Sequence, residues 1–592
     1  MALSLGEIDS WDTGALEEFS HQLGRRSRTL EGLGTSVQDA AKIPGWMGQG
    51  ADAAQLNFAR LSDDISDRAA TVGAITELVT SLIDQVKALK RALDDARDHA
   101  ARFGLVITDD GAVIDGPGTG TAEAVAGALG GPAAAAAAKA AKEAARAEIT
   151  AQVQAILATA ADVEADTTAI LTKAAEGGFT GDGMSVEDAS EKGQIEADGM
   201  FAAPPPPSTP AAQRAWAESL SPDQLGEAAD NYPAELANAY QIAPWARERA
   251  AWNYLPKLRD ELTSQAALLE EQHGAAQMMH EKTRAWTDLQ TVRQKLRDLD
   301  QIETSVKGSE GLHLLGLRPH ENGVGAVVAQ GDIAAADHVA VHVPGMGTET
   351  ADKLDSGGDL PGEIEKIERL QLAMDDSLEY AGRRGERVAA VAYMNMDYPD
   401  FLPQARTPDY ADAAAPDLAG MLNGIKSTAA GETNLTLLGH SYGSLTSSEA
   451  LQAGGRADNV VFYGSPGLES SGEEFDPAST GVPDGNRYIM LAKGDPIAPG
   501  GYFSPFGGPP ADTPGLTRLD TNSHKVIIDG DEVRLGASSG HSEYDGYRST
   551  SQWNMAAIAT GAPENAIAYE SDLQYRGRSF HHSVGDDLRR VR

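Results

Sequence analysis

Two long stretches near the N-terminus repeat apolar residues at intervals of seven, a spacing that places them on one face of a helix. The first series runs through residues 13–38, and the second begins after the sequence Pro44-Gly45-Trp46-Met47-Gly48 has interrupted the pattern. Two long amphipathic helices joined by a tight turn form an antiparallel hairpin. We therefore expect a helical hairpin over residues 1–104. The repeating positions are Leu16, Leu23, Leu30 and Val37 in the first series, and Phe58, Ile65, Val72, Val79, Val86 and Leu93 in the second.

The region that follows the hairpin divides into two parts. Residues 105–175 open with two apolar runs across Asp110-Gly111, which predicts a β-hairpin, and continue as an Ala-rich helix from about Ala133 to Ala175. That helix is expected to complete the helical region. Residues 176–212 are rich in Gly and Asp and end in the proline run 204–207, which predicts a semi-rigid linker. A ligand for a proline-binding domain is the alternative interpretation of that run, and a spacer is favoured.

Beyond the linker, residues 213–310 are predicted to be helical, with a long helix from about 256 to 302. From residue 311 to 560, short apolar runs alternate with helical stretches, which is typical of a doubly wound, mostly parallel sheet. The predicted fold class is therefore an all-α region followed by an α/β domain, with a polar tail at 561–592. Strands are expected at 326–331, 337–343, 388–393, 434–438, 459–463 and 488–491, and helices between them at 360–381, 411–428 and 444–453.

Charge narrows the set of partners. The 592 residues include 88 Asp and Glu against 48 Lys and Arg, a formal net charge of −40, which repels nucleic acid and anionic membranes. Cysteine is absent, which excludes disulfides and thiolate chemistry. No run of about eighteen apolar residues predicts a transmembrane helix. The first residues have neither a basic nor an apolar leader region, so no Sec signal peptide is expected.

The sequence from Asn434 to Ser444 carries the clearest chemical signal. A Leu- and Thr-rich strand leads into Gly439-His440-Ser441-Tyr442-Gly443, and a helical segment follows. This is the G-x-S-x-G nucleophile elbow in its strand–turn–helix context. Ser441 is the candidate nucleophile, and the elbow glycines Gly439 and Gly443 avoid collisions in a tight turn. The N–H of Tyr442 is expected to face a developing oxyanion. An ordinary glycine-flanked turn is the competing interpretation.

A nucleophilic serine needs a base and an orienting acid, which follow it in the order acid, then histidine, in folds of this kind. Asp495 stands at the polar end of a predicted strand, where such sheets keep their chemistry. His541 lies in a loop ahead of the terminal helix. Together with Ser441 they are the candidate catalytic triad. The alternatives are Asp458 and Asp484 for the acid, and His524, His581 and His582 for the base.

The loop after an earlier strand supplies a second candidate oxyanion donor. Val343-Pro344-Gly345-Met346-Gly347-Thr348 places a Gly-rich turn after an apolar strand, and the backbone N–H of Met346 is expected to join that of Tyr442. A phosphate-binding loop is disfavoured because no G-K-[ST] follows. His338 and His342 on the strand are more typical of core residues than of ligands.

The N-terminal hairpin, through Trp46 and Gly48, resembles the WXG family of small helical substrates of type VII (ESX) secretion. The resemblance implies a WXG-family or other type VII partner for the N-terminal helices. That family usually carries Y-x-x-x-D/E just after the second helix, which is not found here. The one match, Tyr393 to Asp397, lies inside the α/β region. The resemblance implies a cytoplasmic protein or one exported by a type VII system, with a partner supplying the signal.

Residues from about 213 to 560 resemble an actinobacterial α/β-hydrolase family of unknown function, often fused behind WXG-like helices. The resemblance is carried by several separated motifs, and it implies an α/β-hydrolase fold with Ser441, Asp495 and His541 as the triad. It assigns no substrate. The motifs are Trp216 with Leu220-Ser221-Pro222, the segment Pro244 to Asn253, Gly331-Asp332, V-P-G-M-G-T, G-H-S-Y-G-S, Gly494-Asp495-Pro496 and Gly540-His541.

The leading hypothesis is a lipase-like serine esterase that cleaves carboxylic esters, for example lipid or cell-envelope esters, without a metal or organic cofactor. The alternative is a secretion-associated interaction protein or exported effector, in which the N-terminal helices act and the hydrolase domain is inactive or secondary.

Overall fold

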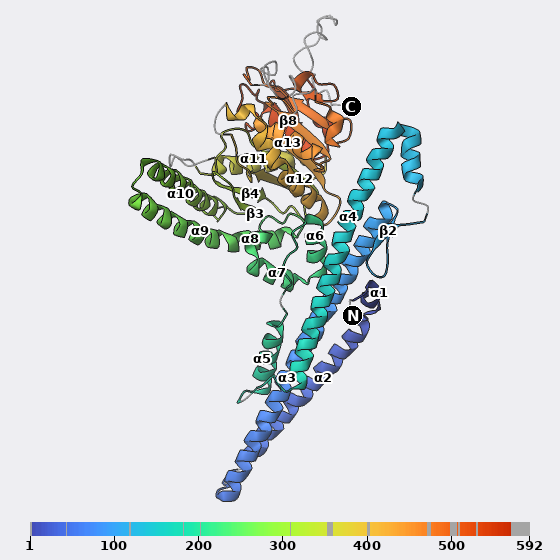
Figure 1. Ribbon diagram of the computed structural model, residues 1–592, viewed down its shortest axis with the longest axis vertical. Coiled ribbons are helices and arrows are strands. Elements are labelled where there is room, and N and C mark those ends of the chain that lie inside the picture. The colour runs from blue at the N-terminus through green and yellow to red at the C-terminus, as the bar shows by residue number, and fades with distance from the viewer. Residues whose placement is uncertain are drawn as a thin grey trace, which may run out of the picture. The chain divides into compact units, whose positions relative to one another are not determined.

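The computed structural model describes two compact units, Met1–Tyr232 and Pro233–Arg592, each with its own interior (Figure 1). The first is helical and the second is built around a sheet, which confirms the predicted fold class. The description covers residues 3–569 except 43, 118–119, 182, 202, 308, 352–358, 400–402, 470–474, 498–505, 507–509 and 529–530.

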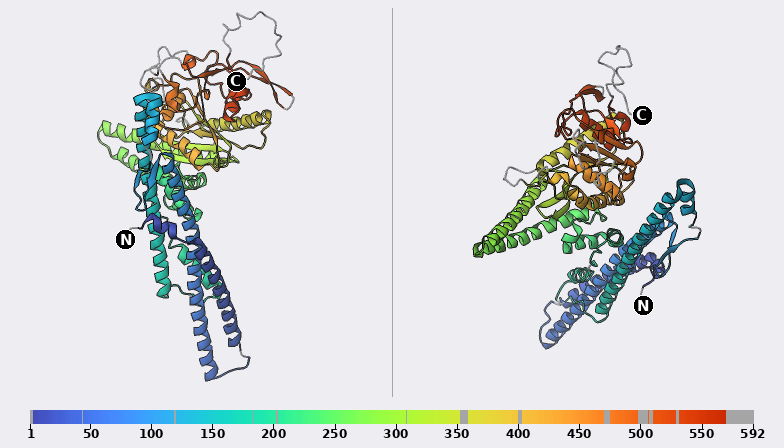
Figure 2. Two further views of the ribbon diagram at one scale, coloured as in Figure 1. Left: turned by 90° about the vertical axis from the view of Figure 1, so that its right-hand side faces the viewer. Right: turned by 45° about the horizontal axis from the view of Figure 1, so that its top comes forward.

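The first unit is dominated by long helices that run alongside one another, α2 against α3 and α3 against α4 (Figures 1 and 2). A short β-hairpin joins α3 to α4, where the sequence predicts one. The elements are α1 (Leu5–Ser10), α2 (Thr13–Ala41), α3 (Gln49–Arg102), β1 (Leu105–Ile107), β2 (Val113–Asp115), α4 (Gly120–Ala175), α5 (Val186–Asp198), α6 (Pro210–Ser219) and α7 (Pro222–Asn231).

The apolar repeat of seven forms the interior of the α2–α3 hairpin over part of its length. Leu23 and Leu30 of α2 are buried, as are Ile65, Val79 and Val86 of α3. Near the turn between α2 and α3 the positions of the repeat are less buried, and apolar side chains beside them are exposed to solvent. These are Leu33, Trp46, Met47, Leu56 and Leu61, with 49%, 45%, 87%, 63% and 45% of their surface exposed.

The predicted linker at 176–212 differs from the structure. Residues 186–198 form α5, which packs along α3, and Phe179 and Phe201 are buried. Some glycines of this segment are close contact points: a methyl carbon placed on Gly193 would lie 1.9 Å from the carbonyl oxygen of Ala70. Composition suggested a spacer because glycines that allow close helix packing look like glycines that allow flexibility. The division between units falls instead between Tyr232 and Pro233.

The helices after the linker also differ from the prediction. Trp216 lies in α6 and is buried in the first unit, where its indole N–H donates to the carbonyl oxygen of Pro204 at 3.1 Å. The single helix expected at 256–302 is two helices, α9 (Pro244–Ala275) and α10 (Met279–Lys307), which pack together as a hairpin (Figure 1). The short helix α8 (Pro233–Leu236) precedes them.

The second unit contains an eight-stranded sheet in the order β10-β9-β8-β7-β5-β6-β4-β3. The pairings from β10 to β6 are parallel, whereas β4 is antiparallel to both β6 and β3. Its strands are β3 (Leu312–Pro319), β4 (Val324–Gln330), β5 (His338–Val343), β6 (Val388–Tyr393), β7 (Asn434–His440), β8 (Asn459–Tyr463), β9 (Arg487–Met490) and β10 (Thr517–Leu519).

Helices cover both faces of the sheet, so its central strands are buried on both sides and read as continuous apolar runs. On one face, alternate strand residues such as Val341 and Leu437 pack with α12 (Asp409–Thr428) and α13 (Tyr442–Gln452). On the other, Ala340 and Leu438 pack with α11 (Leu360–Tyr380) and α14 (Thr550–Ala559). Because β5, β7, β8 and β9 are parallel, their carboxyl ends meet at one edge.

A separate antiparallel hairpin, β11 (His524–Ile528) with β12 (Asp531–Leu535), lies between β10 and α14 in the sequence. Among the helices of the described residues, none has a stretch both long and apolar enough to pass through a membrane.

The contact between α5 and α3 leads to the first prediction. Replacing Gly193 by Ala is expected to destabilise the helical unit by about 1–3 kcal/mol, because the new methyl group meets a backbone oxygen that cannot move aside. The measurement is urea unfolding of the full chain, with hydrogen exchange in α5 as the local readout.

Gly24→Ala is the matched control, because Gly24 is also a helical glycine but a methyl group there meets nothing within 4 Å. That change should leave stability unaltered or raise it by up to about 1 kcal/mol. Equal effects of the two substitutions would show that α5 does not pack closely on α3.

Candidate active site

Ser441 stands in the turn between β7 and α13, at the carboxyl edge of the sheet. Its backbone has φ 51° and ψ −126°, and it is one of two non-glycine residues in the described chain with positive φ. Such a conformation costs about 1–3 kcal/mol and persists only where its surroundings hold it. Here its N–H donates to the carbonyl oxygen of Tyr463 at the end of β8, at 3.0 Å.

Three glycines surround Ser441 because the backbone segments approach too closely for side chains. A methyl carbon on Gly443 would lie 2.3 Å from the carbonyl oxygens of Val343 and Pro344, and one on Gly439 would lie 2.8 Å from the Cα of Ser444. A methyl carbon on Gly345, in the loop after β5, would lie 2.6 Å from the Cβ of Ser441. The turn that links β7 to α13 is therefore packed directly against the end of β5.

The structure brings together the three residues predicted as a triad. The Nε2 atom of His541 lies 2.7 Å from the Oγ of Ser441, and its Nδ1 lies 3.0 and 3.1 Å from the two carboxylate oxygens of Asp495. A carboxylate only accepts hydrogen bonds, so Nδ1 carries the proton. In the neutral ring Nε2 is then an acceptor, directed at the Ser441 hydroxyl.

Asp495 is 2% exposed, and its surroundings keep it charged. Burial alone would raise the pKa of this carboxyl, but hydrogen bonds from His541, from Tyr544 and from the N–H of Ile497 outweigh burial and lower the pKa below its ordinary value. The buried carboxylate is thus held in the form that orients an imidazole and stabilises its protonated form.

The loops that carry the acid and the histidine are joined to each other directly. Lys493, two residues before Asp495, forms a parallel bridge with Ser539, and the N–H of Gly540 donates to the carbonyl oxygen of Lys493 at 3.0 Å. A backbone connection therefore holds the two loops at a fixed spacing, independently of the triad side chains.

His440, the residue before Ser441, binds the backbone of the loop that carries His541. Its Nε2 donates to the carbonyl oxygen of His541 at 2.9 Å, and its ring stacks on that of Tyr463 with centroids 5.0 Å apart. Burial lowers the pKa of His440 to about 4, so the ring is neutral near pH 7. In the sequence, His440 stands out only as the variable residue of the G-x-S-x-G motif.

Gly464 is a second residue of the site that the sequence alone does not predict. It follows β8 with φ +60°, and a methyl carbon there would lie 3.2 Å from Oδ2 of Asp495 and 3.2 Å from Cε1 of His541. A side chain at this position would press on both the acid and the base and would have to adopt a positive φ, so glycine is favoured there. The sequence feature that points to Gly464 is its position directly after the apolar run of β8, where a glycine followed by Ser465 indicates a tight turn at the end of the strand.

The proposed oxyanion donors are the residue after the serine and the residue after Gly345. Tyr442 is the first residue of α13, where backbone N–H groups have no partner within the helix. Met346 follows Gly345, which touches Ser441, and its side chain packs against a cluster that contains Tyr442 and Phe506. Both residues therefore border the serine.

The alternative residues that the structure describes have partners other than Ser441. Asp458 accepts from Lys426 and from the N–H of Leu435, as a turn residue does, and Asp484 is an exposed partner of Arg487. His524 pairs with Asp520 at 2.7 Å. His338 and His342 are buried in β5 beside Glu386 and Glu363, and His581 and His582 lie outside the described residues.

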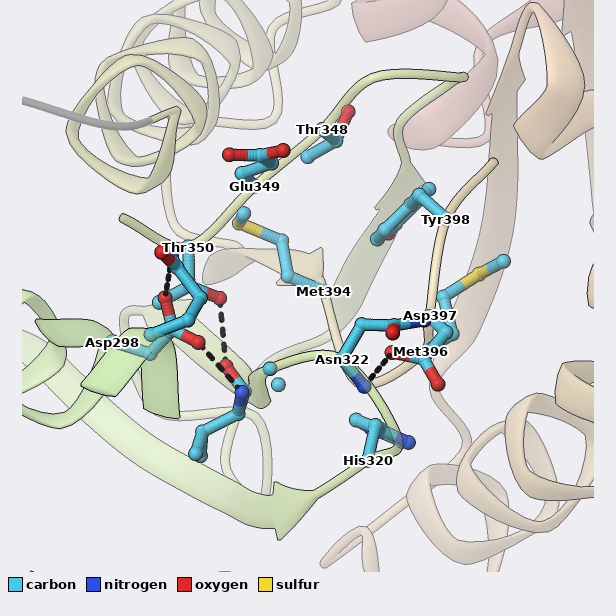
Figure 3. Close-up of a pocket in the computed structure, with 14 residues that line it drawn as sticks. Asp298, His320, Asn322, Thr348, Glu349, Thr350, Met394, Met396, Asp397 and Tyr398 are labelled. Atoms are coloured by element: carbon cyan, nitrogen blue, oxygen red, sulfur yellow. Dashed lines mark hydrogen bonds between the residues drawn. The ribbon is translucent and has the colours of Figure 1, made fainter. Parts of the chain in front are cut away.

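A cavity of about 50 Å³ lies beside the loop that continues from Met346 (Figure 3). The residues that line the cavity come from α10, the turn between β3 and β4, and the loops after β5 and β6. The buried Asp298 accepts hydrogen bonds there from the N–H groups of Val324 and Ala351. Burial raises the pKa of Asp298 to about 6. Within the described ranges, no cluster of three or more His, Asp or Glu side chains is arranged to hold a metal ion.

Comparison with known proteins agrees with this architecture. A family model described as alpha/beta hydrolase matches residues 319–505. An uncharacterized protein of Mycobacterium tuberculosis is 34% identical over 240 residues, which cover 39% of this chain and 84% of that protein. One from Mycobacterium bovis shows the same values. A further uncharacterized Mycobacterium tuberculosis protein is 26% identical over 337 residues, 54% of this chain and 48% of that protein.

The chain therefore belongs to the α/β-hydrolase family. Membership supports a hydrolase activity and leaves the reaction class and substrate to the site itself.

The position of Gly464 leads to the second prediction. Gly464→Ala is expected to slow the labelling of Ser441 by a fluorophosphonate at least about tenfold, because the methyl group displaces Asp495 or His541 from the contact geometry. Labelling is followed by mass spectrometry of the peptide that contains Ser441.

Gly481→Ala is the control, because Gly481 also has positive φ, at +68°, but a methyl group there meets nothing within 4 Å. It carries the same backbone strain without the contact and should label at the rate of the unaltered protein. If the two variants label alike, Gly464 has no particular role.

Proposed function

We propose that the protein is a serine hydrolase that cleaves carboxylic esters. The observation that carries this proposal is the continuous contact from Ser441 through His541 to Asp495, with Ser441 in a strained turn at the carboxyl edge of the sheet. Nucleophile, base and orienting acid stand in hydrogen-bonding reach and in the required order.

In the proposed reaction, His541 Nε2 accepts the hydroxyl proton as Ser441 Oγ attacks the ester carbonyl. Asp495 stabilises the imidazolium that forms. The N–H groups of Met346 and Tyr442 donate to the tetrahedral oxyanion, and one such donor typically contributes about 3 kcal/mol. His541 then passes its proton to the leaving alcohol, and the acyl-enzyme remains. Water activated by the same histidine releases the acid and restores Ser441.

Apolar side chains beside the nucleophile favour an ester with an apolar acyl part, such as a lipid or cell-envelope ester. Tyr442, Leu445 and Phe506 are buried together, with Met346 and Tyr410 packed against them. The hydroxyl of Tyr442 donates to the carbonyl oxygen of Thr407 at 2.7 Å, so its polar end is satisfied and its ring packs within this apolar cluster.

The third prediction tests the nucleophile. Ser441→Ala is expected to lower kcat for p-nitrophenyl esters by at least about a thousandfold with the fold intact, because it removes the attacking oxygen. Esters of increasing chain length are assayed, with thermal unfolding as the check on folding. Equal rates for the two proteins would reject the proposal.

The exposed apolar residues at the α2–α3 turn support a second candidate function, the binding of a helical partner such as a WXG-family protein in type VII secretion. Met47 is 87% exposed and Leu56 63%, which is unusual for large apolar side chains grouped at one end of a hairpin. Export as an effector would follow from that partner and is tested by comparing culture filtrates with and without a type VII system.

The fourth prediction concerns that surface. In co-expression with WXG-family proteins from the same genome, Trp46→Ala with Met47→Ala is expected to weaken co-purification at least about tenfold, since large aromatic residues often dominate interfaces. Ester hydrolysis should not change.

Trp245→Ala provides the comparison, because Trp245 has the same 45% exposure as Trp46 but lies in α9. It should leave co-purification unchanged. If no WXG-family protein binds, or both tryptophan variants weaken binding equally, the second function is rejected.

A further inference from the structure

Tyr544 stands behind the candidate acid and is no part of the triad. It lies three residues after His541 and is fully buried. Its hydroxyl donates to Oδ2 of Asp495 at 2.7 Å and accepts from the N–H of Ala492 at 2.8 Å. Because the N–H of Ala492 can only donate, it occupies a lone pair of the hydroxyl oxygen. The phenolic proton is thereby directed at the carboxylate.

The two oxygens of Asp495 are held by different donors. Oδ1 accepts from the N–H of Ile497 at 2.8 Å, and Oδ2 accepts from Tyr544. His541 Nδ1 contacts both oxygens. Without the tyrosine hydroxyl, the histidine would be the remaining donor recorded for the buried Oδ2, and a charged oxygen left short of donors is costly. The carboxylate would then be held only by the N–H of Ile497 and by His541, and its rotation about the Cβ–Cγ bond would be less restricted.

We propose that Tyr544 is a positioning residue that fixes the Asp495 carboxylate and shares its charge, so that one loop supplies both the base and the group that holds its acid. This proposal rests on the hydrolase activity proposed above. Tyr544 does not touch the reacting atoms; it acts through Asp495 on the orientation and proton affinity of His541.

A purely structural role for a buried tyrosine is the competing explanation, and the fold offers a comparison residue. Tyr463 is also fully buried, its ring centroid lies 5.4 Å from that of Tyr544, and its hydroxyl donates to Asp545 at 3.2 Å. Like Tyr544, it is buried, lies in the same group of rings and donates its hydroxyl to a carboxylate. Its hydroxyl does not bond to Asp495.

The titratable groups around the acid and the base come from several elements. Besides each other and Tyr544, they are His440 after β7, Tyr463 of β8, Asp545 in the histidine loop and Lys366 of α11. Tyr544→Phe and Tyr463→Phe each remove one phenolic hydroxyl and leave the carboxylates, the histidines and Lys366 unaltered. Because burial raises the pKa of both tyrosines, neither substitution changes the charge of the site near pH 7.

The fifth prediction compares Tyr544→Phe with Tyr463→Phe in ester hydrolysis across pH. Tyr544→Phe is expected to lower kcat at least about tenfold with KM within about twofold, since hydrogen bonds to charged groups are among the strongest. The acid limb of kcat/KM should move to higher pH by at least about 0.3 unit, because a carboxylate without the phenol holds the imidazole proton more tightly. Tyr463→Phe should keep the original limb.

A double-mutant cycle isolates the contact between Tyr544 and Asp495. In an Asp495→Asn background, Tyr544→Phe should slow fluorophosphonate labelling by less than about twofold, whereas in the unaltered background it slows labelling at least about tenfold. Equal factors in the two backgrounds, or an acid limb that moves equally in both tyrosine variants, would overturn the proposal.

If Tyr544→Phe does not fold, 3-fluorotyrosine at position 544 keeps the ring and the hydroxyl while making the hydroxyl a stronger donor. The acid limb should then move to lower pH, and an unmoved limb overturns the proposal. An unaltered protein that neither hydrolyses esters nor labels at Ser441 would reject the proposed function itself, which distinguishes the two failures.

Discussion

The close approach of backbone segments at Ser441 is the constraint on which the functional edge of the second unit depends. The turn after β7 touches the loop after β5 at Gly345 and Gly443, and its N–H bonds to the end of β8. Small residues at these places allow three strand ends to meet within van der Waals contact. The strained φ of Ser441 persists because these neighbours hold it from three sides.

Those parts of the fold that repeat a local rule could be predicted from the sequence. The buried strands β6 and β8 begin and end where their apolar runs do, and the spacing of Gly439 and Gly443 around Ser441 predicts the elbow. Ser441 and Asp495 could be predicted because each follows an apolar strand, and His541 because it comes after both in the sequence and ahead of the terminal helix. Gly464 and Tyr544 were missed, because their significance is a distance to Asp495 across the fold and no local pattern records such a distance.

The helical unit shows the converse error. Residues 176–212 combine glycine, acidic residues and a proline run, the usual composition of a spacer, yet α5 packs along α3. What separates the two cases is the partner: Gly193 faces Ala70, and Gly73 faces Ser190. Single-sequence composition carries no information about a partner more than a hundred residues away. Similarly, β3 escaped prediction because a bulge near Gly316 interrupts its alternation.

The bridge between Lys493 and Ser539 has a consequence for how this fold can diversify. Asp495 and His541 are 46 residues apart in sequence. The segment between them contains β10 and the β11–β12 hairpin, and the bridge between Lys493 and Ser539 joins its two ends. Lengthening a closed excursion adds little entropic cost, about 0.6 kcal/mol for each doubling. Insertions there would spare the pairing of acid and base. This segment is therefore a place where an engineered module can be inserted while the bridge between Lys493 and Ser539 keeps the acid and the base together.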